Sequence, residues 1–167
     1  MDDGRRPAAL VWECAKDAMY RSAYSVLGNR ADAEDAVMDA MERIINNEEK
    51  FSGLSCGDMR ALAAIYSRNT AINIYNANKK RPLPLEELPE SPDMSSVEDE
   101  ASGLDASERM LRLIERMPPS YRDPLLLRVR FSMSPKEIAQ VLGIEAGAVR
   151  TRLSRARDWL KKNERRE

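Results

Sequence analysis

Apolar residues recur at spacings of three and four along most of the chain, whereas strict alternation of apolar and polar residues is nearly absent. This spacing places apolar side chains on one face of an α-helix. It predicts about four helices before residue 82, with a loop or short turn over 47–57 and long helices over about 8–27, 31–46 and 58–79. After residue 104 it predicts helices over about 104–117 and 120–131, and then two more. We therefore expect an all-α protein.

The helical pattern stops in the middle of the chain, where four prolines fall within residues 82–92. Proline lacks a backbone N–H and clashes with the preceding turn, so no helix continues through this segment. Residues 82–108 also carry nine acidic and no basic side chains, which favours an extended, solvated chain. We expect two small helical domains, residues 1–81 and 108–167, joined by an acidic Pro-rich linker over 82–107.

Charge is distributed unevenly between these parts, although the whole chain has a net charge of only −1. Residues 1–81 carry 12 basic and 12 acidic side chains, whereas residues 109–167 carry 15 basic and 7 acidic ones. Positive charge concentrated on one domain is typical of a nucleic-acid-binding surface.

Several kinds of chemistry lack candidate residues. The chain contains no histidine and no Gly-rich phosphate loop, so we predict no enzyme, no cofactor and no metal site. The two cysteines, Cys14 and Cys56, match no metal or redox spacing, and we expect two reduced thiols in a cytoplasmic protein. No apolar run approaches the roughly 18 residues of a membrane span, and no apolar run follows the acidic start. Membrane insertion and a signal peptide are therefore not expected.

The segment 134–144 has the features of a short, capped helix followed by a tight turn. Ser134 is a favourable N-cap, and Glu137 completes a capping box three residues later. Pro135 occupies the first helical position, where its missing N–H costs nothing. Gly143 supplies the left-handed conformation that ends the helix.

A second helix is expected from about Glu145 or Ala146. Its apolar residues form one narrow stripe, namely Val149, Leu153, Ala156 and Leu160. Arginines flank the stripe, and Thr151 and Ser154 lie opposite it. Such a pair of helices is typical of a helix-turn-helix that lays its second helix in the major groove of DNA. The alternative is an ordinary helical hairpin with a solvated basic surface. The candidate contacts with DNA are Ala146, Ala148, Arg150, Thr151, Arg152, Ser154 and Arg155.

These residues resemble a known family. Residues 137–139 (EIA), 142–144 (LGI) and 148–157 (AVRTRLSRAR), with 113–118 and 122–128 upstream, are similar to the C-terminal promoter-reading domain of sigma-70 family sigma factors of the extracytoplasmic-function (ECF) type. Residues 32–41 resemble the family's acidic helix that docks on the polymerase clamp, and residues 68–73 and 79–81 resemble its promoter-melting segment. This chain departs from the family's usual residues at a few positions of these motifs. They are Met38 and Met41 in the docking helix, Asn73 in the melting segment and Ala148 in the second helix of the helix-turn-helix. A divergent member is the natural interpretation.

Acidic residues of the second predicted helix recur on one side, while apolar residues occupy the other. By itself the acidic side has a simple alternative explanation as a solvated outer face. The resemblance makes it a candidate contact for core RNA polymerase, where charge complementarity sets association rate and register. The candidate polymerase-binding residues are Asp32, Glu34, Asp35, Met38, Asp39 and Glu42.

The third predicted helix carries aromatic residues near a basic end. Single-stranded DNA is held by stacking on aromatic rings beside cations. An equal alternative is that Tyr66 and Tyr75 belong to the domain core. The basic residues would then simply end the helix, where cations interact favourably with the helix dipole. The spacing also allows Asn69 to face the core. The candidate melting residues are Arg68, Asn69, Asn73, Tyr75, Lys79, Lys80 and Arg81.

The resemblance implies a bacterial sigma factor that binds the clamp and flap regions of core RNA polymerase. It would read the upstream promoter element with its helix-turn-helix and assist melting of the downstream element. An anti-sigma factor is a further partner that the family implies. The alternatives are a stand-alone regulator that binds duplex DNA as a dimer and a helical adaptor that binds only protein.

Overall fold

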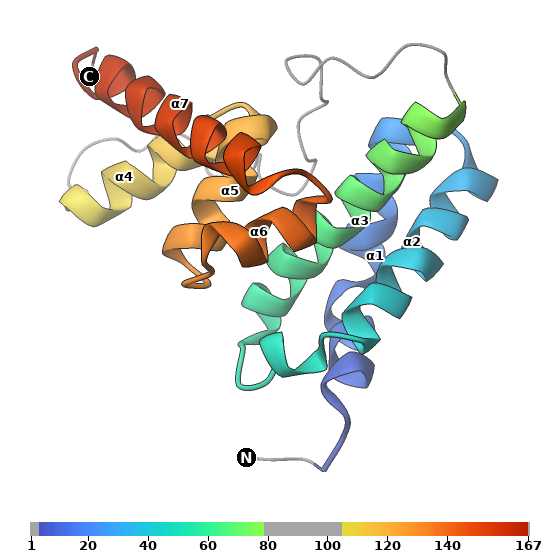
Figure 1. The fold of residues 1–167 in the computed structure, drawn as a ribbon. Coiled ribbons are helices and arrows are strands. Elements are labelled where there is room, and N and C mark those ends of the chain that lie inside the picture. Colours follow the sequence, from blue (N-terminus) through green and yellow to red (C-terminus); the bar gives the residue numbers. More distant parts are fainter. Residues whose placement is uncertain (1–3, 79–104, 167) are drawn as a thin grey trace. The chain divides into compact units, whose positions relative to one another are not determined.

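The computed structural model describes residues 4–78 and 105–166, and within these residues all regular structure is helical, as expected (Figure 1). The chain divides into two compact units, Met1–Pro84 and Leu85–Glu167. The expected linker over 82–107 lies almost entirely outside the described residues. The helices of the first unit are α1 (Pro7–Leu27), α2 (Arg30–Ile45), a 3-10 helix (Glu48–Lys50) and α3 (Cys56–Asn78). Those of the second are α4 (Ala106–Glu115), α5 (Pro119–Val129), α6 (Pro135–Leu142) and α7 (Ala146–Glu164).

The N-terminal unit is an up-down-up arrangement in which α1, α2 and α3 each pack against the other two (Figure 1). Consequently α1 and α3 run parallel, and the Ser67 hydroxyl of α3 donates to the Met19 carbonyl of α1 at 2.7 Å. Alanines line the contacts between these helices, and their small side chains let the backbones approach closely. The fully buried alanines are Ala15, Ala23, Ala33, Ala36, Ala40, Ala63 and Ala71.

The turn between α1 and α2 is fixed by a cap on each helix. Gly28 adopts a left-handed conformation with φ 72°, and its N–H donates to the Tyr24 carbonyl at 2.8 Å. Asn29 then caps α2 by accepting a hydrogen bond from the Asp32 N–H at 2.9 Å. A Gly C-cap followed at once by an Asn N-cap allows a tight reversal between two long helices.

The segment between α2 and α3 closes the core around Tyr66. Phe51 is fully buried, and its ring centroid lies 5.8 Å from that of Tyr66. The Arg43 guanidinium lies over the Tyr66 ring at 5.3 Å. Burial raises the pKa of Tyr66 to about 12, although the nearby Arg43 charge acts in the opposite direction. Tyr66 is therefore a core residue rather than a stacking platform for DNA bases.

The C-terminal unit is built around α7, which contacts α4, α5 and α6. Its apolar stripe is buried as predicted at Val149, Leu153 and Ala156, while Leu160 is half-buried. The largest fully buried side chains that complete this core are Met117, Leu127, Ile138 and Val141. Burial of this apolar material is the main force that holds α7 in place.

The start of α6 confirms the predicted capping box. The Ser134 hydroxyl accepts from the Glu137 N–H at 3.2 Å, and the Glu137 carboxylate accepts from the Ser134 N–H at 2.7 Å. Gly143 ends the helix in a left-handed conformation with φ 66°. Both ends of α6 are thus fixed by local backbone chemistry.

Replacing Ser134 with Ala is expected to destabilise the C-terminal unit by about 1 kcal/mol, because the Glu137 N–H loses its acceptor. For a unit of this size that loss lowers the melting temperature by about 4–8 °C. Thermal denaturation followed by circular dichroism measures it. The matched control is Ser107→Ala, an exposed serine in the first turn of α4. An equal shift in both variants would remove the special role of the cap.

Candidate nucleic-acid interface and docking surface

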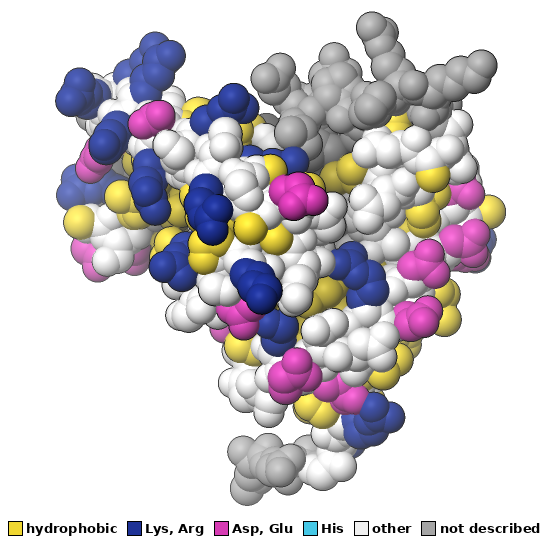
Figure 2. Space-filling model, in the orientation of Figure 1, with side chains coloured by type: hydrophobic (Ala, Val, Ile, Leu, Met, Phe, Trp, Pro, Cys, Tyr) yellow, Lys and Arg dark blue, Asp and Glu magenta, His cyan; other side chains and the backbone are white. Residues whose placement is uncertain are grey.

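The helix-turn-helix presents a cationic outer side of α7. Dark-blue Lys and Arg side chains follow this helix in Figure 2. Arg150, Thr151, Ser154 and Arg155 are all exposed, with Thr151 and Ser154 opposite the buried stripe and the two arginines beside them. We call these four residues the recognition face. The Thr151 hydroxyl donates to the Gly147 carbonyl at 3.1 Å, so its oxygen remains available as an acceptor.

The other candidates on α7 are less exposed. Ala146 and Ala148 are half-buried near the start of the helix, where a small side chain allows close approach of a ligand. Arg152 is also half-buried, and burial lowers the pKa of its guanidinium. The Asp123 carboxylate and the Tyr121 phenol of α5 act in the opposite direction on that pKa. Arg152 therefore interacts with its own domain, whereas Arg150 is exposed.

The acidic side of α2 is exposed as expected, and magenta Asp and Glu side chains follow this helix in Figure 2. Glu34, Asp35, Asp39 and Glu42 are exposed, whereas Asp32 is half-buried at the helix start. Met38 lies among them with 63% of its surface exposed. We call Asp32, Glu34, Asp35, Met38, Asp39 and Glu42 the docking surface. The opposite side is buried as expected, at Ala33, Val37, Ala40, Met41 and Ile44.

Two acidic residues of the docking surface have local partners. The Arg30 Nε lies 2.8 Å from a Glu34 carboxylate oxygen, and this contact raises the pKa of Arg30. The Asn29 amide donates to the Asp32 carboxylate at 2.9 Å. Both contacts are at the start of α2, where the positive end of the helix dipole also stabilises carboxylates. The part of the surface that projects farther along α2 is formed by Asp35, Met38, Asp39 and Glu42.

Sequence reasoning missed one apolar residue beside the docking surface. Ile45 is 45% exposed and lies seven residues after Met38, on the same side of α2. Its spacing from Met38 was the available signal. The neighbouring Ile44 is fully buried, and an Ile-Ile pair does not reveal which member faces the core.

The candidate melting residues divide into three groups in the structure. Arg68 and Asn69 are buried, with 3% and 9% of their surfaces exposed, and the Asn69 amide donates to the Ile65 carbonyl at 2.8 Å. Neither side chain is exposed in this conformation, and their part in promoter melting stays a prediction. Asn73 is exposed and Tyr75 is half-buried in the last turns of α3. Lys79, Lys80 and Arg81 lie outside the described residues.

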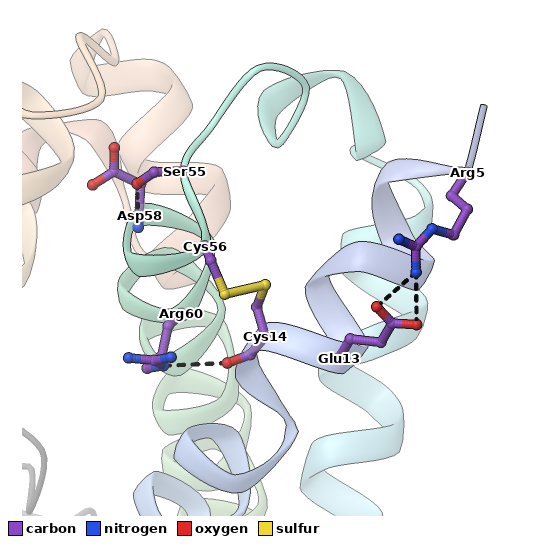
Figure 3. Close-up of a disulfide and its surroundings, with 7 residues drawn as sticks. All are labelled: Arg5, Glu13, Cys14, Ser55, Cys56, Asp58 and Arg60. Carbon is purple, nitrogen blue, oxygen red and sulfur yellow. Dashed lines mark hydrogen bonds and ion pairs between the residues drawn. A yellow bond between two sulfur atoms is a disulfide. The ribbon is translucent and has the colours of Figure 1, made fainter. Parts of the chain in front are cut away.

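The cysteines also differ from the expectation. Cys14 of α1 and Cys56, the first residue of α3, are joined by a disulfide, so they are not two separate reduced thiols (Figure 3). Their separation of 42 residues in the sequence hides this proximity.

Among the helices over residues 4–78 and 105–166, none has the length and hydropathy of a membrane span.

Comparison with known proteins agrees with this geometry. Residues 107–160, which run from Ser107 in α4 to Leu160 in α7, match the family model of sigma-70 region 4. The chain is 30% identical to the RNA polymerase sigma-E factor of Streptomyces coelicolor over 145 residues, which cover 84% of this chain and 76% of that protein. It is also 30% identical to the ECF RNA polymerase sigma factor SigW of Bacillus subtilis, over 92% of this chain and 87% of that one.

A third relative, the ECF RNA polymerase sigma factor SigE of Mycolicibacterium smegmatis, is 27% identical over 87% of this chain and 56% of its own length. These relatives extend across both helical units and are named as sigma factors, so the stand-alone dimeric regulator is not favoured. The chain belongs to the sigma-70 family of RNA polymerase sigma factors and is a member of the ECF type.

Proposed function

We propose that this sigma factor binds core RNA polymerase through the docking surface of α2 and reads the upstream promoter element through the recognition face of α7. The observation that carries the proposal is the exposure of Arg150 and Arg155 on a helix whose opposite stripe is buried. A recognition helix must be held rigidly against its domain while its outer side chains reach base edges and phosphates.

The N-terminal unit supplies the second half of the proposal. The docking surface combines carboxylates with the exposed Met38, and this mixture suits a partner that is basic and partly apolar. On the polymerase side we assign the clamp to this surface and the flap region to the C-terminal unit, following the family. The melting role rests on Asn73 and Tyr75 of the described residues, together with Lys79, Lys80 and Arg81.

The sigma factor itself performs no chemistry in this proposal, since RNA synthesis belongs to the polymerase. It works in the bacterial cytoplasm, where the polymerase and promoter DNA are found. An anti-sigma factor is a further partner, which would compete with the polymerase for the same chain.

The test is a pull-down with bacterial core RNA polymerase followed by run-off transcription on a library of genomic promoters. Stable binding with promoter-specific transcripts is the expected result, and the transcripts identify the recognition sequence. Absence of polymerase binding together with salt-sensitive duplex binding by the full chain would overturn the proposal.

Replacing Arg150 with Ala is expected to weaken binding to the identified promoter by about 1–3 kcal/mol, because a base-reading arginine loses its contacts with the major-groove edge. Competition binding of the polymerase holoenzyme to promoter and scrambled duplexes measures the loss. Lys162→Ala is the matched control, since this exposed cation lies in the last turn of α7. The control should weaken both duplexes equally. Equal losses on both duplexes for Arg150→Ala would show that Arg150 contacts only phosphates.

A further inference from the structure

The disulfide joins two helices at one end of the N-terminal unit (Figure 3). Cys14 lies in the N-terminal half of α1, and Cys56 is the first residue of α3. Their α-carbons are 5.5 Å apart, within the usual range for a disulfide. The backbone of the folded unit therefore already holds the two sulfurs at bonding positions.

The cross-link closes a loop that contains the docking surface. The two cysteines are separated by 42 residues, and all of α2 and the 3-10 helix lie between them. A covalent link across a long loop removes conformations from the unfolded chain and so favours the folded state. The stability of the docking surface is thereby coupled to the bonding state of two sulfur atoms.

The surroundings of the pair allow small reagents to reach it. Cys56 is exposed, whereas Cys14 is half-buried. Cys56 is the first residue of the 23-residue α3, so its sulfur lies at an open helix end that small oxidants and reductants can reach.

Charged residues lie near the two cysteines along both helices (Figure 3). The Arg60 Nε donates to the Cys14 backbone carbonyl at 3.2 Å, which links α3 to α1 near the disulfide (Figure 3). Asp58 has the opposite sign, two residues after Cys56, and its N–H donates to the Ser55 hydroxyl at 3.1 Å. On α1, a Glu13 carboxylate oxygen lies 2.9 Å from a guanidinium nitrogen of Arg5. This ion pair balances the negative charge of the residue that precedes Cys14.

We infer that Cys14 and Cys56 form a reversible thiol–disulfide pair that sets the stability of the polymerase-docking unit. This inference rests on the proposed function, because polymerase works in a cytoplasm whose thiol pool keeps permanent disulfides rare. Disulfides that do occur there are usually transient and redox-sensing. Oxidation would preserve the docking unit under oxidising stress, and reduction would return it to its less stable form.

The oxidant class that fits an exposed cysteine is a hydroperoxide. The Cys56 thiolate attacks the peroxide, the O–O bond breaks, and Cys56 becomes a sulfenic acid while hydroxide or alkoxide leaves and takes up a proton. The Cys14 sulfur then attacks the Cys56 sulfur, the S–O bond breaks, and water leaves with the Cys14 proton. Each sulfur loses one electron, and the peroxide bond accepts both. A thiol reductant reverses the bond through a mixed disulfide.

The experiment compares the full chain after reduction with dithiothreitol and after treatment with hydrogen peroxide. Alkylation followed by mass spectrometry counts free thiols, and circular dichroism follows melting. Oxidation should remove both free thiols without joining two chains, and should raise the melting temperature of the N-terminal unit by on the order of 10 °C. A glutathione buffer at cytoplasmic potential should restore both thiols and the lower melting temperature.

Cys14→Ser and Cys56→Ser are the matched controls, and each should melt near the reduced wild-type chain under both conditions. Because the wild-type chain is its own comparison, a poorly folded variant does not block the test. Equal melting of the two redox forms, cross-links between chains, or a disulfide that resists the glutathione buffer would overturn the inference.

Polymerase binding separates this inference from the proposed function. At a temperature between the two melting midpoints, only the oxidised chain should bind core polymerase. If neither form bound polymerase at low temperature, the proposed function would fail, while thiol counting and melting would still decide whether the pair is a redox switch.

Discussion

Reversing two carboxylates of the docking surface, Asp35→Lys together with Asp39→Lys, is expected to weaken binding of core RNA polymerase by at least about a hundredfold. Both side chains are exposed, four residues apart on the same side of α2. If they face a basic polymerase surface, the change replaces attraction with like-charge repulsion, which costs several kcal/mol. Equilibrium binding of the labelled chain to core polymerase measures the effect.

The same variant should keep its fold, because neither side chain contributes to the core and lysine is a good helix former. Circular dichroism and the melting temperature verify this point. Asp17→Lys together with Glu49→Lys is the matched control, since these exposed carboxylates lie outside α2 and give the same change in net charge. Comparable weakening by the control pair would mean that net charge, rather than the docking surface, governs the interaction.

The parts of the fold that were predictable are those set by neighbouring residues. The capping box of Ser134 and Glu137 and the left-handed Gly143 were visible in the sequence because cap chemistry spans only a few residues. The buried stripe of α7 and the buried side of α2 followed from the helical repeat. Among the described residues, helix ends differed from expectation by no more than two residues, because the last turn of a helix carries little of the apolar repeat.

The middle of α3 was harder to predict because this helix packs against two others. Every residue from Ile65 to Ala71 is buried, so no single face of the segment stands out. Ser67 donates to α1, and the Arg43 guanidinium of α2 donates to the Thr70 hydroxyl at 3.4 Å. The three-four spacing allowed for a buried Asn69 but gave no sign that Arg68 is also buried.

The disulfide depended on tertiary arrangement rather than on spacing. In an up-down-up bundle the first and third helices run parallel, so residues near their N-termini lie at the same end. Cys14 and Cys56 both lie toward such N-termini. The signal was therefore present once the bundle topology was assumed, although no motif of the two cysteines alone reveals it.

The second large effect is expected at a carboxylate inside the C-terminal unit. Asp123 and Arg122 are 5% and 3% exposed, and the Arg122 Nε lies 3.8 Å from an Asp123 carboxylate oxygen. The Asp123 charge also raises the pKa of Arg152 of α7, so one carboxylate stabilises two guanidinium charges. Replacing Asp123 with Ala should destabilise this unit by about 3–5 kcal/mol, because a buried charge loses its compensation.

A loss of that size approaches the whole stability of a domain this small, for which roughly 0.05–0.15 kcal/mol per residue is usual. The recognition face should then lose its support, so promoter binding by Asp123→Ala should fail while the docking surface of α2 still binds core polymerase. Calorimetry and the polymerase pull-down measure the two effects separately. Asp158→Ala, which removes an exposed carboxylate of α7, is the matched control and should leave the melting temperature within a few degrees of wild type. If Asp123→Ala had the same melting temperature as this control, the charges of Arg122 and Arg152 would not depend on the carboxylate. Apolar packing alone would then hold α7 against α5.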